Sequence, residues 1–412
     1  MGLKIYIAGH EMTKFQEVTL KLQYDSLADT FAIKGDYNPN NVADKAMFKP
    51  CAFQTALILW ERAPNQVFPL MTGTVTGIDL SDLPAPTLNT ISGYSNTGIL
   101  QDCQVVEQSM QFDAQTIAQI ATTICGYFNL QVVIDPSVSD VCNTVNAVTS
   151  IDILQTAGNY LGEICRNYNI VLSHTANGHV LLTSAKKVIV PVTVPISATT
   201  NTNQIVTEIA GIQYTTYNDN RYTEQAKPAF SFTASGKGQH YTKMTLRTDG
   251  EKMHSRIFVT GQSQGRTLGP LQNFKDNPYV PKRIGFYAPT ISLYQYRQRA
   301  VVNTVDPGPL KPLTARNVLA DELKSISLDI DVPAWFLGAS GTEGDSAYSE
   351  GTFIRPNILV SVQNPELYLF KANLWFVESV TLNHTPAART ATLHCVLPQC
   401  FNNEEVTVNI FE

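Results

Sequence analysis

The most specific chemical signature in the chain is the GQSQG segment at residues 261–265, which matches the GxSxG nucleophile elbow of hydrolases. In those enzymes a strand leads into the serine, and a helix follows at once and packs beneath the turn. A strand pattern does precede this segment, but Gly269 and Pro270 follow within a few residues and would break a helix. The regular alternation of strands and helices that the hydrolase fold requires is also missing. We therefore interpret the segment as structural and predict no catalytic residue.

Histidines occur in two pairs that could bind a metal. His174 and His179 flank a predicted hairpin turn, and His384 and His394 lie on or beside neighbouring predicted strands. A stable zinc site needs a third and a fourth ligand, and the sequence offers none at a suitable spacing. The pattern therefore favours surface histidines on hairpins, and we predict no metal and no cofactor.

Acidic residues also alternate along one predicted strand, where Asp329 and Asp331 share a face. A calcium site or a glycosidase centre would need opposing acids that the sequence does not place. We interpret this pair as a solvated strand face. Seven cysteines show no CxxC spacing and an odd count, which is typical of buried free thiols in a reducing compartment: residues 51, 103, 125, 142, 165, 395 and 400.

Charge is sparse and unevenly distributed. Only 16% of the residues are charged, against about a quarter in typical proteins, and the net charge is −6. Such a surface either contacts other proteins or uses Thr, Asn and Gln for solubility. Between Ala63 and Cys165 there is no Lys or Arg, so this region would repel nucleic acid. Its acidic residues are Asp79, Asp82, Asp102, Glu107, Asp113, Asp135, Asp140, Asp152 and Glu163.

The elements that must carry these residues are mostly strands. Three β-patterns lie near the C-terminus, at 351–362, 374–382 and 391–397. In the last, Ala391, Leu393, Cys395 and Leu397 alternate with polar residues, as in a half-buried strand. Three consecutive antiparallel strands need their edges closed or covered, so we expect them to end a small β-barrel.

A similar set of strand patterns fills the N-terminal quarter. Residues 52–60 form a long apolar run, residues 67–80 contain two glycines typical of a bulged strand, and short strands are expected at 87–91 and 99–103. We expect a second small barrel here, beside the first one.

The period changes after this region. Helices are predicted from Ile117 to Phe128, with Asp113 as N-cap, and from Ile151 to Asn167, with a capping box of Thr149 and Asp152. A hairpin is expected around Asn177-Gly178, followed later by a helix over 314–327.

The predicted fold is mainly β with an α/β insert, and it comprises two small β-barrel tube-forming domains plus accessory α+β domains. We expect a first barrel domain at 1–105 and an α/β insert at 106–186. A β-rich domain with loops, contributing in part to the second barrel, is expected at 187–300, and a helix with the second barrel at 301–412. Whether the second barrel is continuous in sequence stays open. The N-terminus enters a strand pattern at once, and no signal peptide or membrane span is predicted.

Several blocks, in order, resemble the baseplate hub proteins of contractile phage tails of the Mu type. They are the strand at 18–20 with 29–31, the segment from Gly93 to Cys103, the helix at 116–121, the Val259 to Gln262 step, and the strand from Arg355 to Val362. The Gln262 step also explains the GQSQG match. The chain departs from the family near the late helix, where the Arg-rich segment is reduced to Arg297, Arg299 and Arg316, and in the long loop at 338–351.

The resemblance implies a homotrimer in which each chain contributes two similar barrels. The resulting pseudo-sixfold ring would join the sixfold tail tube to the threefold central spike and contact baseplate wedge proteins. The protein would reside in the virion tail after assembly in the host cytoplasm, without membrane insertion. DNA would only pass through its channel, and we expect some acids between Asp79 and Glu163, among them Asp82, Asp102 and Glu107, to line it.

Two alternatives remain. One is the hub or adaptor of a phage-like contractile injection or secretion machine, whose spike-hub proteins usually carry a fused needle. The other is a tail-associated cell-wall hydrolase, which would need a catalytic Glu or Cys/His set on a separate domain. Absence of turnover on peptidoglycan or ester substrates would argue against the hydrolase.

Overall fold

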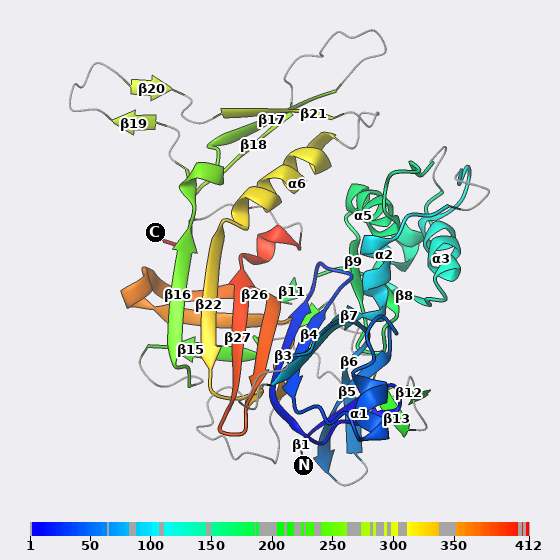
Figure 1. Ribbon diagram of the computed structural model, residues 1–412. Coiled ribbons are helices and arrows are strands. Elements are labelled where there is room, and N and C mark those ends of the chain that lie inside the picture. The colour runs from blue at the N-terminus through cyan, green and yellow to red at the C-terminus, as the bar shows by residue number, and fades with distance from the viewer. Residues whose placement is uncertain are drawn as a thin grey trace.

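A computed structural model gives the three-dimensional arrangement of the chain (Figure 1). It describes residues 2–63, 66–81, 88–106, 111–145, 150–185, 187–188, 204–209, 212–217, 224–225, 228–234, 240–261, 273–280, 283–285, 292–294, 298–303, 311–337, 352–402, 406 and 409–411.

One large sheet of 13 strands dominates the structure. Its main path runs β16 (Lys243–Thr248), β22 (Ile326–Val332), β27 (Arg389–Val396), β26 (Leu369–His384), β3 (Phe15–Gln23), β4 (Thr30–Gly35), β7 (Asn89–Ser95), β6 (Gln66–Asp79), β5 (Thr55–Ala63), β1 (Gly2–Ile7) and β2 (His10–Glu11). Two further strands branch from β26, namely β25 (Leu359–Asn364) and, beyond it, β15 (Phe230–Thr233). The mainly β prediction is confirmed, and the N-terminal and C-terminal strand sets lie side by side, joined where β26 pairs with β3.

The two strand sets repeat one topology. The first has the order β3-β4-β7-β6-β5-β1 and the second the order β16-β22-β27-β26-β25-β15. In sequence order, each strand of one set therefore has a counterpart in the other. The long strands β6 and β26 both carry a register shift, between Val75 and Gly77 and between Val377 and Ser379. One pairing differs, because β1 is antiparallel to β5 whereas β15 is parallel to β25.

Apolar and polar residues alternate along these strands, as the sequence predicted for the C-terminal strand at 391–397. Ala391, Leu393 and Cys395 are buried, while Thr392 and His394 on the opposite face are half-buried. The first repeat shows the same alternation, since Val18, Leu20 and Leu22 are buried between polar neighbours. The buried faces of both sets form one core, which also contains all three tryptophans of the chain.

The second strand set comes from two separate parts of the chain. Strands β15 and β16 form the first part, strands β22, β25, β26 and β27 form the second, and a small module lies between β16 and β22. That intervening module contains β17 (Arg256–Gly261), β18 (Asn273–Asp276), β21 (Gln298–Asn303), β19 (Arg283–Gly285), β20 (Ser292–Tyr294) and helix α6 (Lys311–Leu323). The helix predicted at 314–327 therefore ends early, since Ile326 already begins β22. The remaining short elements are α1 (Val42–Met47), β11 (Lys187–Val188), β12 (Gln204–Ile209), β13 (Ile212–Tyr217), β14 (Glu224–Gln225), β23 (Phe336–Leu337) and β24 (Thr352–Phe353).

An α/β module with its own core follows the first strand set and lies to the right of the sheet in Figure 1. It contains α2 (Ile99–Asp102), α3 (Ile117–Tyr127), β8 (Val132–Ile134), α4 (Ser139–Cys142), α5 (Ala157–Asn167), β9 (Val171–His174) and β10 (Val180–Thr183). The predicted hairpin is confirmed, with Gly178 at a φ of 78° in the turn between β9 and β10. The domain boundaries given above stay predictions.

The predicted start of α3 at Ile117 is confirmed, but the predicted N-caps of α3 and α5 are both wrong. Helix α3 is capped by Thr116 rather than Asp113, because the Thr116 hydroxyl accepts from Gln119 N and the Gln119 side chain accepts from Thr116 N. Helix α5 begins after Thr156, since the Asp152 carboxylate accepts from Leu154 N and holds a turn instead.

Two strand predictions also need correction. The run at 52–60 becomes a strand only from Thr55, because Cys51 and Phe53 have positive φ angles. The segment at 99–103 forms the helical turn α2 rather than a strand. Five of the seven cysteines are buried, as expected for free thiols, and none of the seven forms a disulfide. Within the described part of the chain, no helix is long and apolar enough to cross a membrane.

The shared core gives the first prediction. Leu20 on β3 is fully buried where the two strand sets meet, whereas the neighbouring Lys21 is exposed on the other face. Leu20→Ala should lower the free energy of unfolding by about 2–5 kcal/mol, because it leaves a cavity. Lys21→Ala, the matched control, should change it by less than about 0.5 kcal/mol. Urea unfolding measures both, and equal effects would show that β3 does not bury this face.

Candidate functional site

The most extensive feature outside the core is a polar face that crosses eight strands of the sheet, from β16 to β6. Residues directly opposite each other on neighbouring strands share a face, so the strand registers define rows across it. One row consists of Lys243, Asp331, Thr392, Thr381, Lys21, Thr30, Tyr94 and Thr74, and Thr74 also pairs with Thr55 of β5. Every residue in this row is polar. A second row contains Thr245, Asp329, His394, Ser379 and Gln23.

Two cations on this polar face, Lys34 and Arg247, are paired with acids. Lys34 Nζ lies 2.7 Å from Glu17 Oε2, and Arg247 Nη2 lies 3.1 Å from Asp329 Oδ2. Because Lys34, Glu17 and Arg247 are exposed, these pairs add little stability, but they neutralise positive charge that would otherwise bind phosphate.

A larger ion cluster ties the two strand sets together at one end of this face. Lys324 Nζ lies 2.5 Å from Asp25 Oδ2 and 2.9 Å from Glu378 Oε1, while His394 Nδ1 lies 2.7 Å from Asp329 Oδ1. Burial alone would lower the pKa of Lys324, but the two carboxylates outweigh it and raise that pKa well above the ordinary lysine value. The cluster therefore keeps a charged lysine between strands from opposite ends of the chain.

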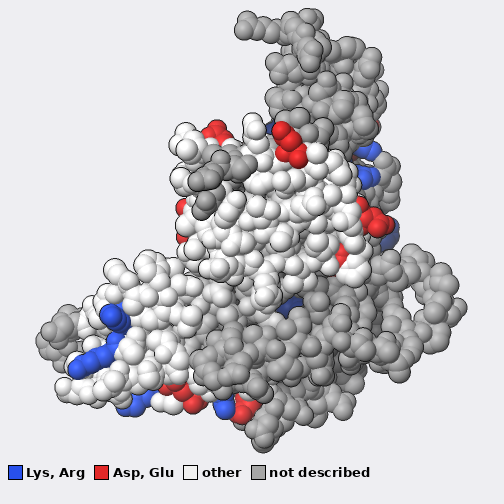
Figure 2. All heavy atoms as spheres, turned by 90° about the vertical axis from the view of Figure 1, so that its right-hand side faces the viewer, with Lys and Arg blue, Asp and Glu red and all other residues white. Residues whose placement is uncertain are grey.

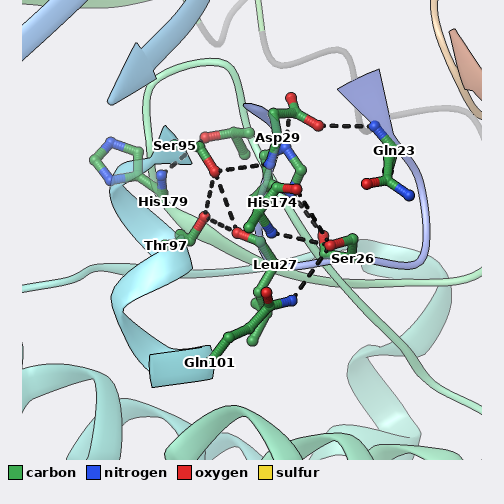
Figure 3. Close-up of polar contacts among 11 residues, drawn as sticks. Gln23, Ser26, Leu27, Asp29, Ser95, Thr97, Gln101, His174 and His179 are labelled. Atoms are coloured by element: carbon green, nitrogen blue, oxygen red, sulfur yellow. Dashed lines mark hydrogen bonds and ion pairs between the residues drawn. The ribbon is translucent and has the colours of Figure 1, made fainter. Parts of the chain in front are cut away.

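A second polar cluster connects the sheet to the α/β module (Figure 3). His174 on β9 is buried, with Nε2 at 2.7 Å from Asp29 Oδ2 and Nδ1 at 2.8 Å from the Ser26 carbonyl. Both ring nitrogens thus face acceptors, which is the pattern of the doubly protonated imidazolium. Burial lowers the pKa of His174, but Asp29 and the Ser26 carbonyl raise it to a net value above the usual range.

The same cluster contains a serine, a histidine and an aspartate, yet it lacks the geometry of a catalytic triad. Ser95 Oγ accepts from Asp29 N and donates to the Leu27 carbonyl, and it also contacts Thr97 Oγ1. In a triad the hydroxyl would instead donate to the histidine. The cluster holds the 24–29 loop in place, and Leu27 of that loop is buried in the core of the α/β module. Its role is to fix the module to the sheet.

The predicted channel acids fall in different places. Asp79 is exposed at the end of β6 on the polar face, in register with Thr90 and Lys34. Asp102 is exposed at the end of α2. Burial, and then the hydrogen bond to Asp102, raise the pKa of Tyr94 on the polar face to about 12. Asp82 and Glu107 lie outside the described residues.

The other candidate residues from the sequence have structural contacts or lie outside the described residues. The GQSQG segment lies outside the described residues beyond Gly261. His394 belongs to the ion cluster, and His384 contacts the rings of Phe15 and Trp335. Asp331 accepts from the Thr392 hydroxyl at 2.6 Å. In the part of the chain that the structure describes, no group of three potential metal ligands occurs.

A third surface is nearly free of charge. Figure 2 shows that the face on the right of Figure 1 carries few Lys, Arg, Asp or Glu among its described atoms. This is the side of the α/β module, most of which lies in the part of the sequence without Lys or Arg. Exposed apolar side chains of this module are Val106, Tyr127, Val145, Ile153 and Leu154.

Comparisons with known proteins agree with this architecture. Residues 97–184 match the family model of the second domain of gp44-like baseplate hub proteins. The predicted resemblance to baseplate hub proteins is confirmed. The match covers the α/β module, and the whole-chain comparisons below extend the agreement at the level of the fold.

Three solved structures have a similar fold over nearly the whole chain. The 43 kDa tail protein of prophage MuSo2 from Shewanella oneidensis has a TM-score of 0.68 at 16% identity, covering 97% of this chain and 99% of that one. A tail protein from Neisseria meningitidis has a TM-score of 0.63 at 14% identity, covering 96% of each chain. The Francisella PdpA–VgrG complex in its lidded form has a TM-score of 0.50 at 9% identity, covering 99% of this chain and 53% of that one. No curated protein sequence matches the chain.

The buried His174–Asp29 pair makes stability depend on pH. Because the folded-state pKa of His174 lies above its unfolded value of about 6.5, the stabilisation is complete below about pH 6 and is lost as the pH rises through the folded-state pKa. Removing one partner by His174→Ala should cost about 3–5 kcal/mol at pH 6. Urea unfolding from pH 5.5 to 8.5 should show the gap between wild type and His174→Gln shrinking with rising pH.

His179 supplies the matched control. Burial lowers its pKa, so its neutral form is favoured in the folded state and the sign of the pH dependence is reversed. The gap between wild type and His179→Gln should not shrink as the pH rises. A constant gap for His174→Gln would mean that His174 carries no charge in the folded protein.

Proposed function

We propose that this chain is a structural, non-enzymatic hub of a contractile phage tail baseplate. Three copies form a ring whose channel lets DNA pass, and the ring joins the tail tube to the central spike. The observation that carries the proposal is the repeated strand order, which gives one chain two tube-like units. Among the described residues, their shared polar face has a strand edge without a pairing strand at each end.

The repeat supports a closed ring for a physical reason. Within the described residues, β16 pairs only with β22. Val75 N still donates to the Gln54 carbonyl, and beyond Val75 β6 pairs only with β7. Such edges present unpaired backbone groups that recruit another strand. Since β16 and the last residues of β6 lie at opposite ends of these eight strands, a head-to-tail contact between copies would continue the sheet. Head-to-tail contacts close into a ring when the rotation from one copy to the next closes. The number three follows from the resemblance to hub proteins.

The polar face supports the channel. In three copies it would contain twenty-four strands, more than the 16–18 strands of barrels that already enclose an aqueous pore. Lys34 and Arg247 are paired with acids, so these two cations would bind phosphate less strongly and would hinder the passage of DNA less. Asp79 and Asp102 would then lie on or beside the channel wall, as the sequence led us to expect.

The surface of the α/β module suggests where partner proteins bind. The charge-poor face of the α/β module, with its exposed apolar residues, suits contact with other baseplate proteins, including the spike, the tube and the wedges. The second candidate function is the hub of a contractile injection or secretion machine. The likeness to the PdpA–VgrG chain, of which this chain spans about half, supports it at the level of the fold.

Mass in solution tests the ring. Light scattering of the purified chain should give about three times 45.4 kDa, and negative-stain images should show a ring with a central hole. Addition of the cognate spike should raise the mass of the assembly by one spike trimer. A monomer that stays monomeric with the spike present would contradict the proposal.

A pair of charge reversals tests which surface faces the channel. Asp331→Lys adds positive charge to the polar face, so it should slow DNA delivery by assembled phage while the ring still forms. Glu163→Lys makes the same change on the exposed side of α5 and should leave delivery unchanged. Slowed delivery by Glu163→Lys alone would place the channel at the α/β module instead.

A further inference from the structure

The repeated sheet also specifies which residues of two copies meet. Inside one chain, β26 of the second strand set pairs with β3 of the first. If the ring repeats this junction between copies, then β6, the counterpart of β26, pairs with β16, the counterpart of β3. This inference rests on the proposed function for the existence of the ring, and the repeated strand order gives the register of the contact between copies.

The bulges align the first pair of strands. Thr76 is skipped in the pairing of β6 with β7, as Glu378 is skipped in the pairing of β26 with β27. Placing one bulge on the other makes Ile78 the counterpart of Val380. It follows that Asp79 corresponds to Thr381 and Leu80 to Leu382.

The neighbouring strands align the second pair. Ile33 on β4 lies between Val18 and Ile91, while Ile330 on β22 lies between Met244 and Leu393. Because Ile91 faces Ile78 and Leu393 faces Val380, Val18 of β3 corresponds to Met244 of β16. The residues that follow agree in type, since Thr-Leu-Lys at 19–21 corresponds to Thr-Leu-Arg at 245–247.

The chain's own junction then gives the contacts between copies. Thr381 faces Lys21, and Leu382 faces Leu20. We propose that β6 of one copy pairs with β16 of the next so that Asp79 faces Arg247 and Leu80 faces Leu246.

Exposure and charge support this register independently. Leu80 is 45% exposed, although its counterpart Leu382 is fully buried against Leu20. Pairing with the next copy would cover Leu80 with Leu246. The side chain of Arg247 is 69% exposed beyond its contact with Asp329, and the proposed register places the Asp79 carboxylate opposite it. A register one residue away would place the charge of Arg247 across from the leucine, on the wrong face.

Cross-linking of two single variants tests the contact. In a Cys51→Ser background, which removes the exposed native thiol, Asp79→Cys and Arg247→Cys chains are co-expressed and oxidised. Paired residues on antiparallel strands have Cα atoms about 4.5–5.5 Å apart, within disulfide range. A cross-linked dimer of the two chains is expected, and neither variant alone should form one, because the contact is heterologous.

A matched control fixes the register. Lys243 lies on the same strand and face as Arg247 but four residues away, about 13 Å along β16. Co-expressed Asp79→Cys and Lys243→Cys chains should therefore give no cross-link, since disulfides do not bridge Cα atoms more than about 7 Å apart. A trimer without the 79–247 cross-link, or with the 79–243 cross-link, would overturn this contact and leave the ring standing.

Charge exchange gives a second measurement. Asp79→Arg puts two cations across the contact, so the trimer should be lost at concentrations where the wild type is trimeric. The double variant Asp79→Arg with Arg247→Asp should restore it. A double variant no more trimeric than the single one would contradict the pairing. A wild type that stays monomeric even with the spike, together with no 79–247 cross-link between the cysteine variants, would overturn both the contact and the ring.

Discussion

The backbone pairing between β26 and β3 is the constraint on which the rest of this structure depends. It joins strands from opposite ends of a 412-residue chain, so it unites two strand sets into one sheet with one core. The ion cluster around Lys324 stabilises this junction from the side, and the polar face is continuous only because of it. The buried His174–Asp29 pair attaches the α/β module to the loop between β3 and β4, so the module does not interrupt the polar face.

Local patterns predicted much of this fold. The alternation in 391–397 predicted strand β27, and the glycines in 67–80 predicted the bulged strand β6, because both patterns act through nearest neighbours. N-cap residues were harder to predict, since Asp113 and Thr116 are both good caps and only the reciprocal bonds with Gln119 decide between them. The continuous sheet depends on pairing across more than 350 residues, which periodicity does not encode.

The candidate site was predicted less completely than the fold. The acidic character of the 63–165 region pointed to Asp79 and Asp102, but the polar face lies mainly on strands outside that region and carries both charge signs. Its signal was present in the sequence as a weak repeat, the Thr-Leu-Lys and Thr-Leu-Arg steps of β3 and β16. Such a short match has meaning only once the strand orders show that the two steps occupy equivalent places.

The charged edges of the sheet also bear on how the free chain avoids aggregation. An unpaired strand edge is a general hazard, because it can add any other strand, including its own copy. If the β16 edges of two copies paired with each other, Lys243 and Arg247 of one copy would lie near Lys243 and Arg247 of the other. If two β6 edges paired, the two Asp79 carboxylates would lie close together. Like charges would thus repel the unproductive pairings, so a newly made chain could stay soluble until its proper neighbour arrives.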